Sequence, residues 1–186
     1  DEAEKRVIPE KVTEDHQGHK KANDRPDYLA VNTHQRLPSF AALADEPIIV
    51  FESPDPARVF AYSPGIVRLD SGRLVATLDL GGPGMKDWPE PKGRRGSSLV
   101  QGKVFTSDDG GLTWTHRADF PFFHATPFVA GKSLYVLGQA ADLMIIRSND
   151  HGATWSAVAK LTVGQFWTGH AHNYRCANGC VYIPME

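Results

Sequence analysis

The sequence contains little cysteine, little net charge and no long apolar run. Its 186 residues include two cysteines and carry a formal net charge of −2. A charge this close to zero is not typical of a nucleic-acid binder, and no stretch approaches the ~20 consecutive apolar residues of a membrane span. We therefore expect neither a nucleic-acid partner nor a membrane span.

The two cysteines, Cys176 and Cys180, do not indicate thiol catalysis, because no histidine stands at a fixed spacing that would activate either thiol. They flank a three-residue turn and would lie nearly opposite each other in a hairpin. A disulfide is feasible there in an oxidising compartment, and two unreactive thiols are the alternative. The first residues contain no apolar run that would indicate a signal peptide. The location we expect is secreted or periplasmic.

What the chain does contain is turn-forming residues. Thirteen prolines and seventeen glycines, with a hydrophobic content of 41%, are typical of a globular, turn-rich, all-β protein. Residues 1–45 are polar and mixed in charge, which indicates an N-terminal arm. The β pattern begins with the apolar run 47–51, so we expect residues 46–186 to form the folded domain.

One eight-residue pattern, Ser-x-Asp-x-Gly-x-Thr-Trp, occurs twice, at 107–114 and 148–155, with its serines 41 residues apart. A period in this range indicates a repeat architecture. An Asp in a turn accepts hydrogen bonds from backbone N–H groups further along, and Gly supplies the positive φ that such a turn needs. The pattern therefore predicts two structural turns, each followed by a strand. Its main positions are Ser107, Asp109, Gly111, Trp114 and Ser148, Asp150, Gly152, Trp155.

This pattern resembles the Asp-box, or bacterial neuraminidase repeat, of the sialidase superfamily. The resemblance implies a β-propeller of four-stranded antiparallel blades. In that family the box lies in the turn between the two outer strands of a blade, away from the active-site face. At ~40–45 residues per blade the chain has room for about three or four blades. We therefore expect a portion of a longer protein, with the missing remainder of the propeller as a possible partner.

Three hairpins alternate with the boxes. Their turns are 70–72, 130–132 and 177–179, and each is flanked by short apolar or β-branched runs. An inner hairpin followed by an outer hairpin that carries the box is what a four-stranded blade requires. Between the first hairpin and the first box lies the Gly/Pro-rich stretch 81–96. There Trp88 could stack on a sugar and Arg94, with its neighbour Arg95, could hold a carboxylate; a solvated loop is the equal alternative.

The candidate site lies where the innermost strands begin, because these starts converge at one mouth of a propeller. They carry Tyr62, His124, His170 and His172. In an extended strand Tyr174 shares a face with the last two histidines, and Arg175 lies on the other face. The spacing His170-Ala171-His172 lacks a third metal ligand, so we expect no metal and no cofactor.

If the resemblance extends to function, it implies exo-cleavage of sialic acid by a Tyr nucleophile with a Glu, an Asp acid/base and three Arg that bind the carboxylate. The sequence departs from the family pattern at the first carboxylate-binding Arg, because residues 62–67, where the family places it, contain no Arg. Arg68 comes directly after this stretch and is the substrate-binding candidate there. The leading prediction is an exo-glycosidase acting on anionic glycans that contain sialic acid or uronate, with a glycan as partner. A first alternative is a uronate lyase with His124 or His172 as base, Arg175 as carboxylate clamp and Tyr174 or Tyr62 as acid. A second alternative is a non-catalytic glycan- or protein-binding propeller.

Overall fold

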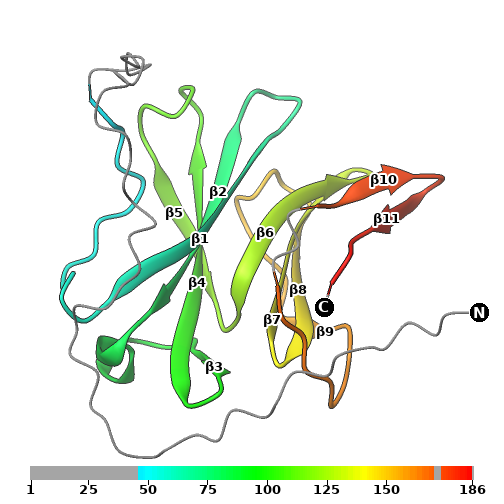
Figure 1. Cartoon of the computed structure of the whole chain (residues 1–186). Helices are drawn as coiled ribbons and strands as arrows, with labels where there is room; N and C mark the ends of the chain where they lie inside the picture. Colours follow the sequence, from blue (N-terminus) through cyan, green and yellow to red (C-terminus); the bar gives the residue numbers. More distant parts are fainter. Residues whose placement is uncertain (1–45, 170–172, 186) are drawn as a thin grey trace, which may run out of the picture. The chain divides into compact units, whose positions relative to one another are not determined.

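The computed structural model describes residues 46–169 and 173–185 (Figure 1). The predicted N-terminal arm, His170 and His172 lie outside the described residues. The elements are β1 (Phe60–Arg68), β2 (Leu74–Gly81), the 3₁₀ helix η1 (Pro83–Asp87), β3 (Gly93–Arg95), β4 (Ser98–Ser107), β5 (Thr115–Phe120), β6 (Phe123–Ala130), β7 (Ser133–Ala140), β8 (Asp142–Ser148), β9 (Ala159–Lys160), β10 (Arg175–Ala177) and β11 (Cys180–Tyr182).

The first sheet is an antiparallel blade with one addition. Strands β1, β2, β4 and β5 pair in that order, and β3 pairs with the first residues of β4. Residues 98–100 of β4 pair with β3, and residues 102–106 pair with β5. Strands β3 and β5 therefore share the edge of β4 that β2 does not occupy. The Gly/Pro-rich stretch 81–96 contains two regular elements, η1 and β3.

The second sheet repeats this order as β6, β7, β8 and β9, all antiparallel, and β10 with β11 forms a separate two-stranded sheet. All three predicted hairpins are present. The predicted fold class, an all-β chain of four-stranded antiparallel propeller blades, is confirmed. In the described residues, two sheets have four blade strands each.

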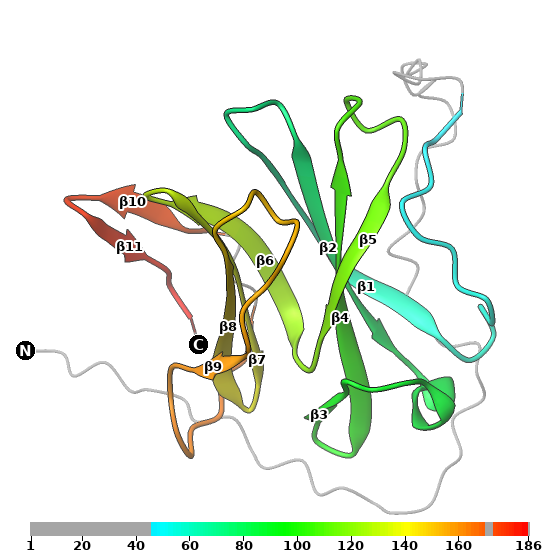
Figure 2. The same cartoon turned by 180° about the vertical axis from the view of Figure 1, so that it is seen from behind.

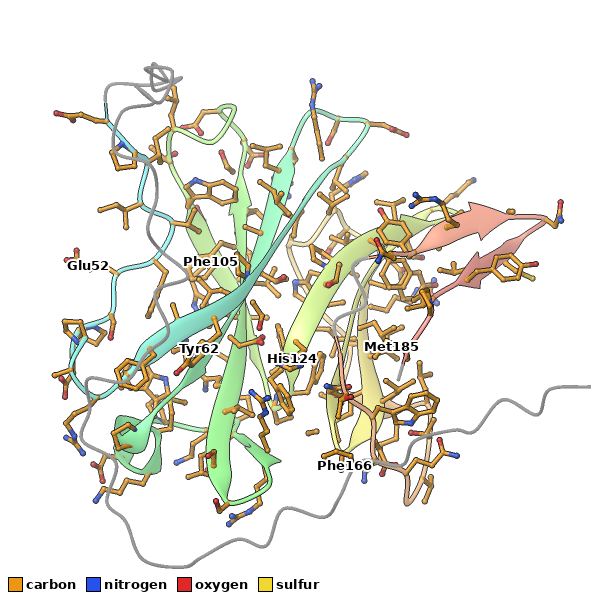
Figure 3. All side chains as sticks on the ribbon, in the orientation of Figure 1. Glu52, Tyr62, Phe105, His124, Phe166 and Met185 are labelled. Atoms are coloured by element: carbon orange, nitrogen blue, oxygen red, sulfur yellow. The ribbon has the colours of Figure 1, made fainter. Side chains whose placement is uncertain are left out.

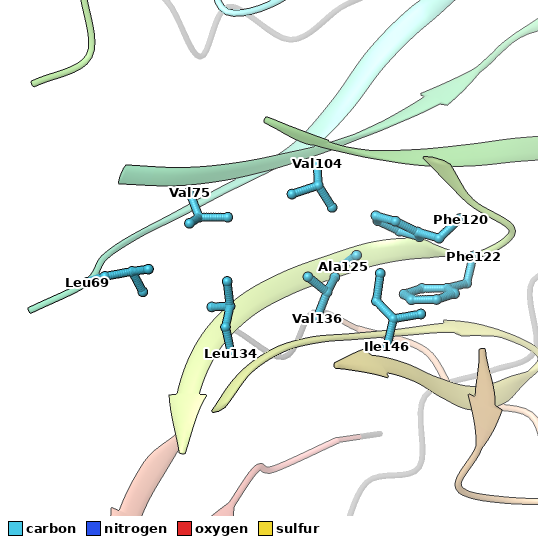
Figure 4. Packing of buried hydrophobic residues seen from close by; sticks show 9 residues of the cluster. All are labelled: Leu69, Val75, Val104, Phe120, Phe122, Ala125, Leu134, Val136 and Ile146. Carbon is cyan, nitrogen blue, oxygen red and sulfur yellow. The ribbon is translucent and has the colours of Figure 1, made fainter. Parts of the chain in front are cut away.

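The main core lies between the two blades (Figure 4). Strands β2 and β4 bury nearly all their residues, as expected for strands covered on both sides. At ~25 cal/mol per Å² of apolar surface buried, such burial is the main favourable contribution to the free energy of folding. The cluster comprises Leu69, Val75, Val104, Phe120, Phe122, Ala125, Leu134, Val136 and Ile146.

Two local expectations were wrong. The apolar run 47–51 forms no strand; Ile48 and Ile49 are exposed, and Phe51 packs its ring on Phe105 with centroids 6.2 Å apart. A strand needs a partner edge, and no strand among the described residues pairs with this run. The cysteines are not opposite each other either, because Cys176 pairs with Val181 while Cys180 pairs with residue 177. Since adjacent residues alternate faces, the two thiols project to opposite faces of the hairpin, and both are free.

The two repeated boxes form the predicted turns. One connects β4 to β5 and the other follows β8 (Figure 2). In the first, Asp109 Oδ1 accepts from the Thr113 N–H at 2.9 Å, Ser107 Oγ accepts from the Gly111 N–H at 2.8 Å, and Trp114 Nε1 donates to the Gly111 carbonyl at 2.9 Å. The second box makes the same bonds between the matching atoms of Asp150, Thr154, Ser148, Gly152 and Trp155.

The carboxylates of the two boxes, Asp109 and Asp150, accept these hydrogen bonds. The Thr113 hydroxyl and N–H, followed by the Ser107 hydroxyl, lower the pKa of Asp109 to about 2. The matching hydroxyls lower the pKa of Asp150 even further. Gly111 and Gly152 have φ of +98° and +86°, which a residue with a side chain rarely adopts. Each box is therefore a turn that its own side chains close.

Candidate active site

A matching β-bulge interrupts the innermost strand of each blade. The pairing of β1 with β2 shifts between Tyr62 and Gly65, and that of β6 with β7 shifts between Phe123 and Thr126. In each bulge one non-glycine residue has a left-handed backbone: Ser63 with φ of +49° and His124 with φ of +53°. Such conformations cost on the order of 1–3 kcal/mol and cluster at functional sites.

The bulges border a pocket of about 520 Å³, which we call the mouth pocket. It lies at the end of the blades opposite the boxes, because Tyr62 pairs with Asp79 near the end of β2, whereas Ser107 of the first box pairs with Leu74 at its start. Tyr62 and His124 both line it (Figure 3). The lining comprises Tyr62, Ser63, Asp79, Leu80, Gly81, Gly82, Arg95, Ser98, Leu99, Val100, Phe123 and His124.

Asp79 is the acidic group of this pocket. Its side chain is 2% exposed, and Oδ2 accepts a hydrogen bond from the backbone N–H of His124 in the other blade. Burial raises the pKa of Asp79 to about 7, and the opposing hydrogen bonds from His124 and Ser63 and the charge of Arg95 do not cancel it. Among the described residues, no standard hydrogen bond reaches its Oδ1. Asp79 is therefore a carboxyl that exchanges its proton near neutral pH.

The second blade places an amide at the equivalent position. Gln139 pairs with Phe123 as Asp79 pairs with Tyr62, and its side chain is 1% exposed. Its Nε2 lies 3.1 Å from Nδ1 of His124. With the amide as donor, Nδ1 is the acceptor, and the proton of the neutral imidazole is on Nε2.

Arg95 reaches the pocket because β3 is anchored firmly. Gln101, fully buried on β4, accepts a hydrogen bond from Trp88 Nε1 at 2.9 Å and donates to the carbonyls of Pro89 and Pro91. A Cβ on Gly93 would stand 1.9 Å from the carbonyl oxygen of residue 121, so β3 lies directly on the link between the blades. The Arg95 guanidinium then lies 5.2 Å from the ring centroid of Phe123.

The other residues predicted for the site lie elsewhere. Trp88 is half-buried in a small apolar cluster, where it anchors the loop and is not among the residues that line the mouth pocket. Arg94 is exposed on β3 and does not line the pocket. Arg68 and Tyr174 come together in a different pocket, at the box end of the blades. Arg175 begins β10 and donates to a backbone carbonyl at 2.8 Å.

Asp79 and Gln139 are not among the site residues predicted from the sequence. A signal was present for Asp79, since it interrupts the otherwise apolar or neutral run Leu74–Leu80 of a buried strand. Within residues 46–169 and 173–185, no three His, Cys, Asp or Glu side chains converge as metal ligands would. No helix among these residues is long and apolar enough to cross a bilayer.

No protein-family model and no curated protein sequence matches the chain. Among solved structures, it is similar to an alpha-L-arabinanase from Penicillium chrysogenum complexed with arabinobiose, at 18% identity over 61% of this chain and 37% of that one, with a TM-score of 0.44. An alpha-L-arabinofuranosidase from Fusarium graminearum gives 19% identity over 64% of this chain and 36% of that one, with a TM-score of 0.43.

A protein of unknown function from Dyadobacter fermentans gives 15% identity over 67% of this chain and 56% of that one, with a TM-score of 0.33. The chain thus spans between about a third and somewhat more than half of the structures it matches. The sugars and activities named belong to those proteins.

Proposed function

We propose that the mouth pocket binds a sugar unit of an anionic glycan and that the protein cleaves the glycosidic bond next to it. The observation that carries this proposal is the meeting of Asp79, Tyr62 and Arg95 around one pocket. These groups supply an acid, a phenol and a cation at a cavity of about 520 Å³, which is large enough for a sugar.

Arg95 is the residue that favours an anionic substrate. Of the lining residues that the structure describes, Arg95 is the only Lys or Arg, and it forms no ion pair with another of the described residues. A guanidinium binds a carboxylate through two parallel N–H···O bonds. A sugar carboxylate of a sialic acid or a uronate would therefore pair with Arg95.

Asp79 is suited to protonate the leaving-group oxygen. A carboxyl with a pKa of about 7 still carries its proton in much of the protein at neutral pH, as a general acid requires. The usual glycosidase has two carboxylates, but among the described residues that line the pocket Asp79 is the only carboxylate. Tyr62, its partner across the β1–β2 pair, would take the nucleophile's place, as a Tyr does in sialidases. The Tyr62 oxygen would attack the anomeric carbon while Asp79 gives its proton to the departing oxygen, and the phenolic proton of the exposed Tyr62 would pass to solvent water. A water molecule that gives a proton back to the Asp79 carboxylate would then hydrolyse the bond between the sugar and Tyr62.

The single carboxylate also favours a second candidate, β-elimination from a uronate. Arg95 would neutralise the carboxylate and a pocket base would remove the adjacent proton. His124 serves as that base only through an unprotonated nitrogen, and its Nδ1 is occupied by Gln139. We therefore place hydrolysis first.

The test is an assay of the whole chain on a fluorogenic sialoside and on uronate oligomers. Hydrolysis releases the fluorophore or a saturated reducing end, whereas elimination produces an unsaturated sugar that absorbs in the ultraviolet. Asp79→Asn and Tyr62→Phe should each lower kcat at least about 100-fold, and the exposed Glu52→Gln serves as the matched control. Unsaturated product would favour the lyase, and binding without turnover would favour a non-catalytic propeller. Full activity of Asp79→Asn would contradict the role of Asp79.

A further inference from the structure

The opposite end of the blades has a second pocket, of about 600 Å³, which we call the turn pocket. Its lining comes from the β1–β2 turn, the β6–β7 turn and the second box, and from Tyr174. None of its lining residues lines the mouth pocket. The lining comprises Val67, Arg68, Leu69, Asp70, Val129, Gly131, Lys132, Ser133, Leu134, Asn149, His151 and Tyr174.

Two cations of this pocket, Arg68 and Lys132, form no ion pair with any residue in the described part of the chain. Their neighbour Arg73 is different, since its Nε lies 2.6 Å from Asp108 Oδ1 and its Nη1 donates to the His151 carbonyl at 3.3 Å. These two cations outnumber Asp70, the only carboxylate among the lining residues that the structure describes. The described lining of the turn pocket therefore carries one more cation than carboxylate.

The uncharged groups of the turn pocket suit a sugar more than a small inorganic anion. The Tyr174 ring is held against Phe128, with centroids 5.3 Å apart. Asn149 Oδ1 accepts from Ser133 Oγ and Arg147 Nε, both at 2.8 Å, so its side-chain NH₂ remains as a donor. An aromatic ring fixed beside an amide donor and two cations provides apolar, neutral and charged contacts in one cavity.

We propose that the turn pocket is a second binding site, which holds a segment of an acidic oligosaccharide whose carboxylates or sulfates pair with Arg68 and Lys132. This site does not depend on the activity proposed for the mouth pocket. The two sources of negative charge, a carboxylate and a sulfate, share the same recognition by cations. They are distinguished by the ligands used in the test.

The test is calorimetric titration of the whole chain with the Arg95→Ala substitution. This substitution weakens binding at the mouth pocket, so that binding at the turn pocket can be measured. The ligands are an oligogalacturonide, a heparin-derived oligosaccharide and a neutral gluco-oligosaccharide of equal length. We expect one site for at least one acidic ligand, with an affinity that falls as salt is added, and weaker binding of the neutral one.

The double variant Arg68→Ala/Lys132→Ala should weaken acidic binding at least about tenfold. The matched control, Lys86→Ala/Lys160→Ala, removes the same charge outside both pockets and should not weaken it. Urea unfolding of each variant checks that the fold is kept. Equal affinity in the two double variants, equal binding of the neutral ligand, or no acidic binding would overturn the proposal. Loss of turnover in Asp79→Asn with this binding intact would separate the two sites.

Discussion

Replacing Asp79 by Asn should make the protein more stable at neutral and alkaline pH. The folded state holds the proton of this buried carboxyl more tightly than the unfolded chain does, because its pKa rises from 3.8 to about 7 on folding. The contribution of Asp79 to the free energy of unfolding is then fully present below pH 3.8 and is lost as the pH rises through 7.

The size of the effect follows from that pKa. A rise from 3.8 to about 7 is about three pKa units, and at 1.36 kcal/mol per unit the loss amounts to about 4 kcal/mol above pH 7. Asn removes the ionisation and keeps an oxygen that can accept from the His124 N–H. It should therefore gain up to about this amount over the native protein at pH 8 and little at pH 4.

The measurement is urea unfolding of the native protein, Asp79→Asn and the exposed control Glu52→Gln at several pH values between 4 and 8.5. The difference between Asp79→Asn and the native protein should grow from pH 4 to about pH 7 and then level off, while the control remains parallel to the native protein. A difference that does not change with pH, or one that shrinks as the pH rises, would refute a raised pKa at Asp79.

Two further substitutions test the framework. Ser107→Ala leaves the buried N–H of Gly111 without its acceptor and should lower the free energy of unfolding by about 1–3 kcal/mol. Exposed Ser97→Ala is the control, and equal urea midpoints of the two variants would contradict a structural role for the box. Gly93→Ala would place a methyl group 1.9 Å from the Pro121 carbonyl oxygen, so we expect a loss of about 1–3 kcal/mol and weaker ligand binding at the mouth pocket. Unchanged stability would show that β3 does not lie on this link.

The parts of the fold that the sequence predicts are those fixed by local chemistry. Each box closes on itself through bonds no more than four residues apart, so its pattern alone defines the turn. The three hairpins follow from turn residues between apolar runs in the same way. The strand expected at 47–51 fails because strand formation depends on a partner edge, which no local pattern supplies.

The site was only partly predictable, because it depends on register across strands and blades. Tyr62 and His124 were found from their equivalent places in the repeats, and both line the mouth pocket. The bulges beside them were not visible in the sequence, and each adds a residue that redirects its neighbours. Arg94 and Arg95 are adjacent in sequence, and alternation along β3 decides which of them lines the pocket.

This pair of arginines offers the most direct test of the central claim, that the mouth pocket binds the carboxylate of an anionic sugar. The measurement is the dissociation constant of a uronate oligomer for Arg95→Ala and for Arg94→Ala, with the Lys132→Ala substitution in both to weaken the turn pocket. Loss of a charged hydrogen-bond pair should weaken binding by about tenfold or more in Arg95→Ala, while Arg94→Ala, whose arginine does not line the pocket, should bind as the parent does. Equal loss in the two variants, or no loss in Arg95→Ala, would contradict the account.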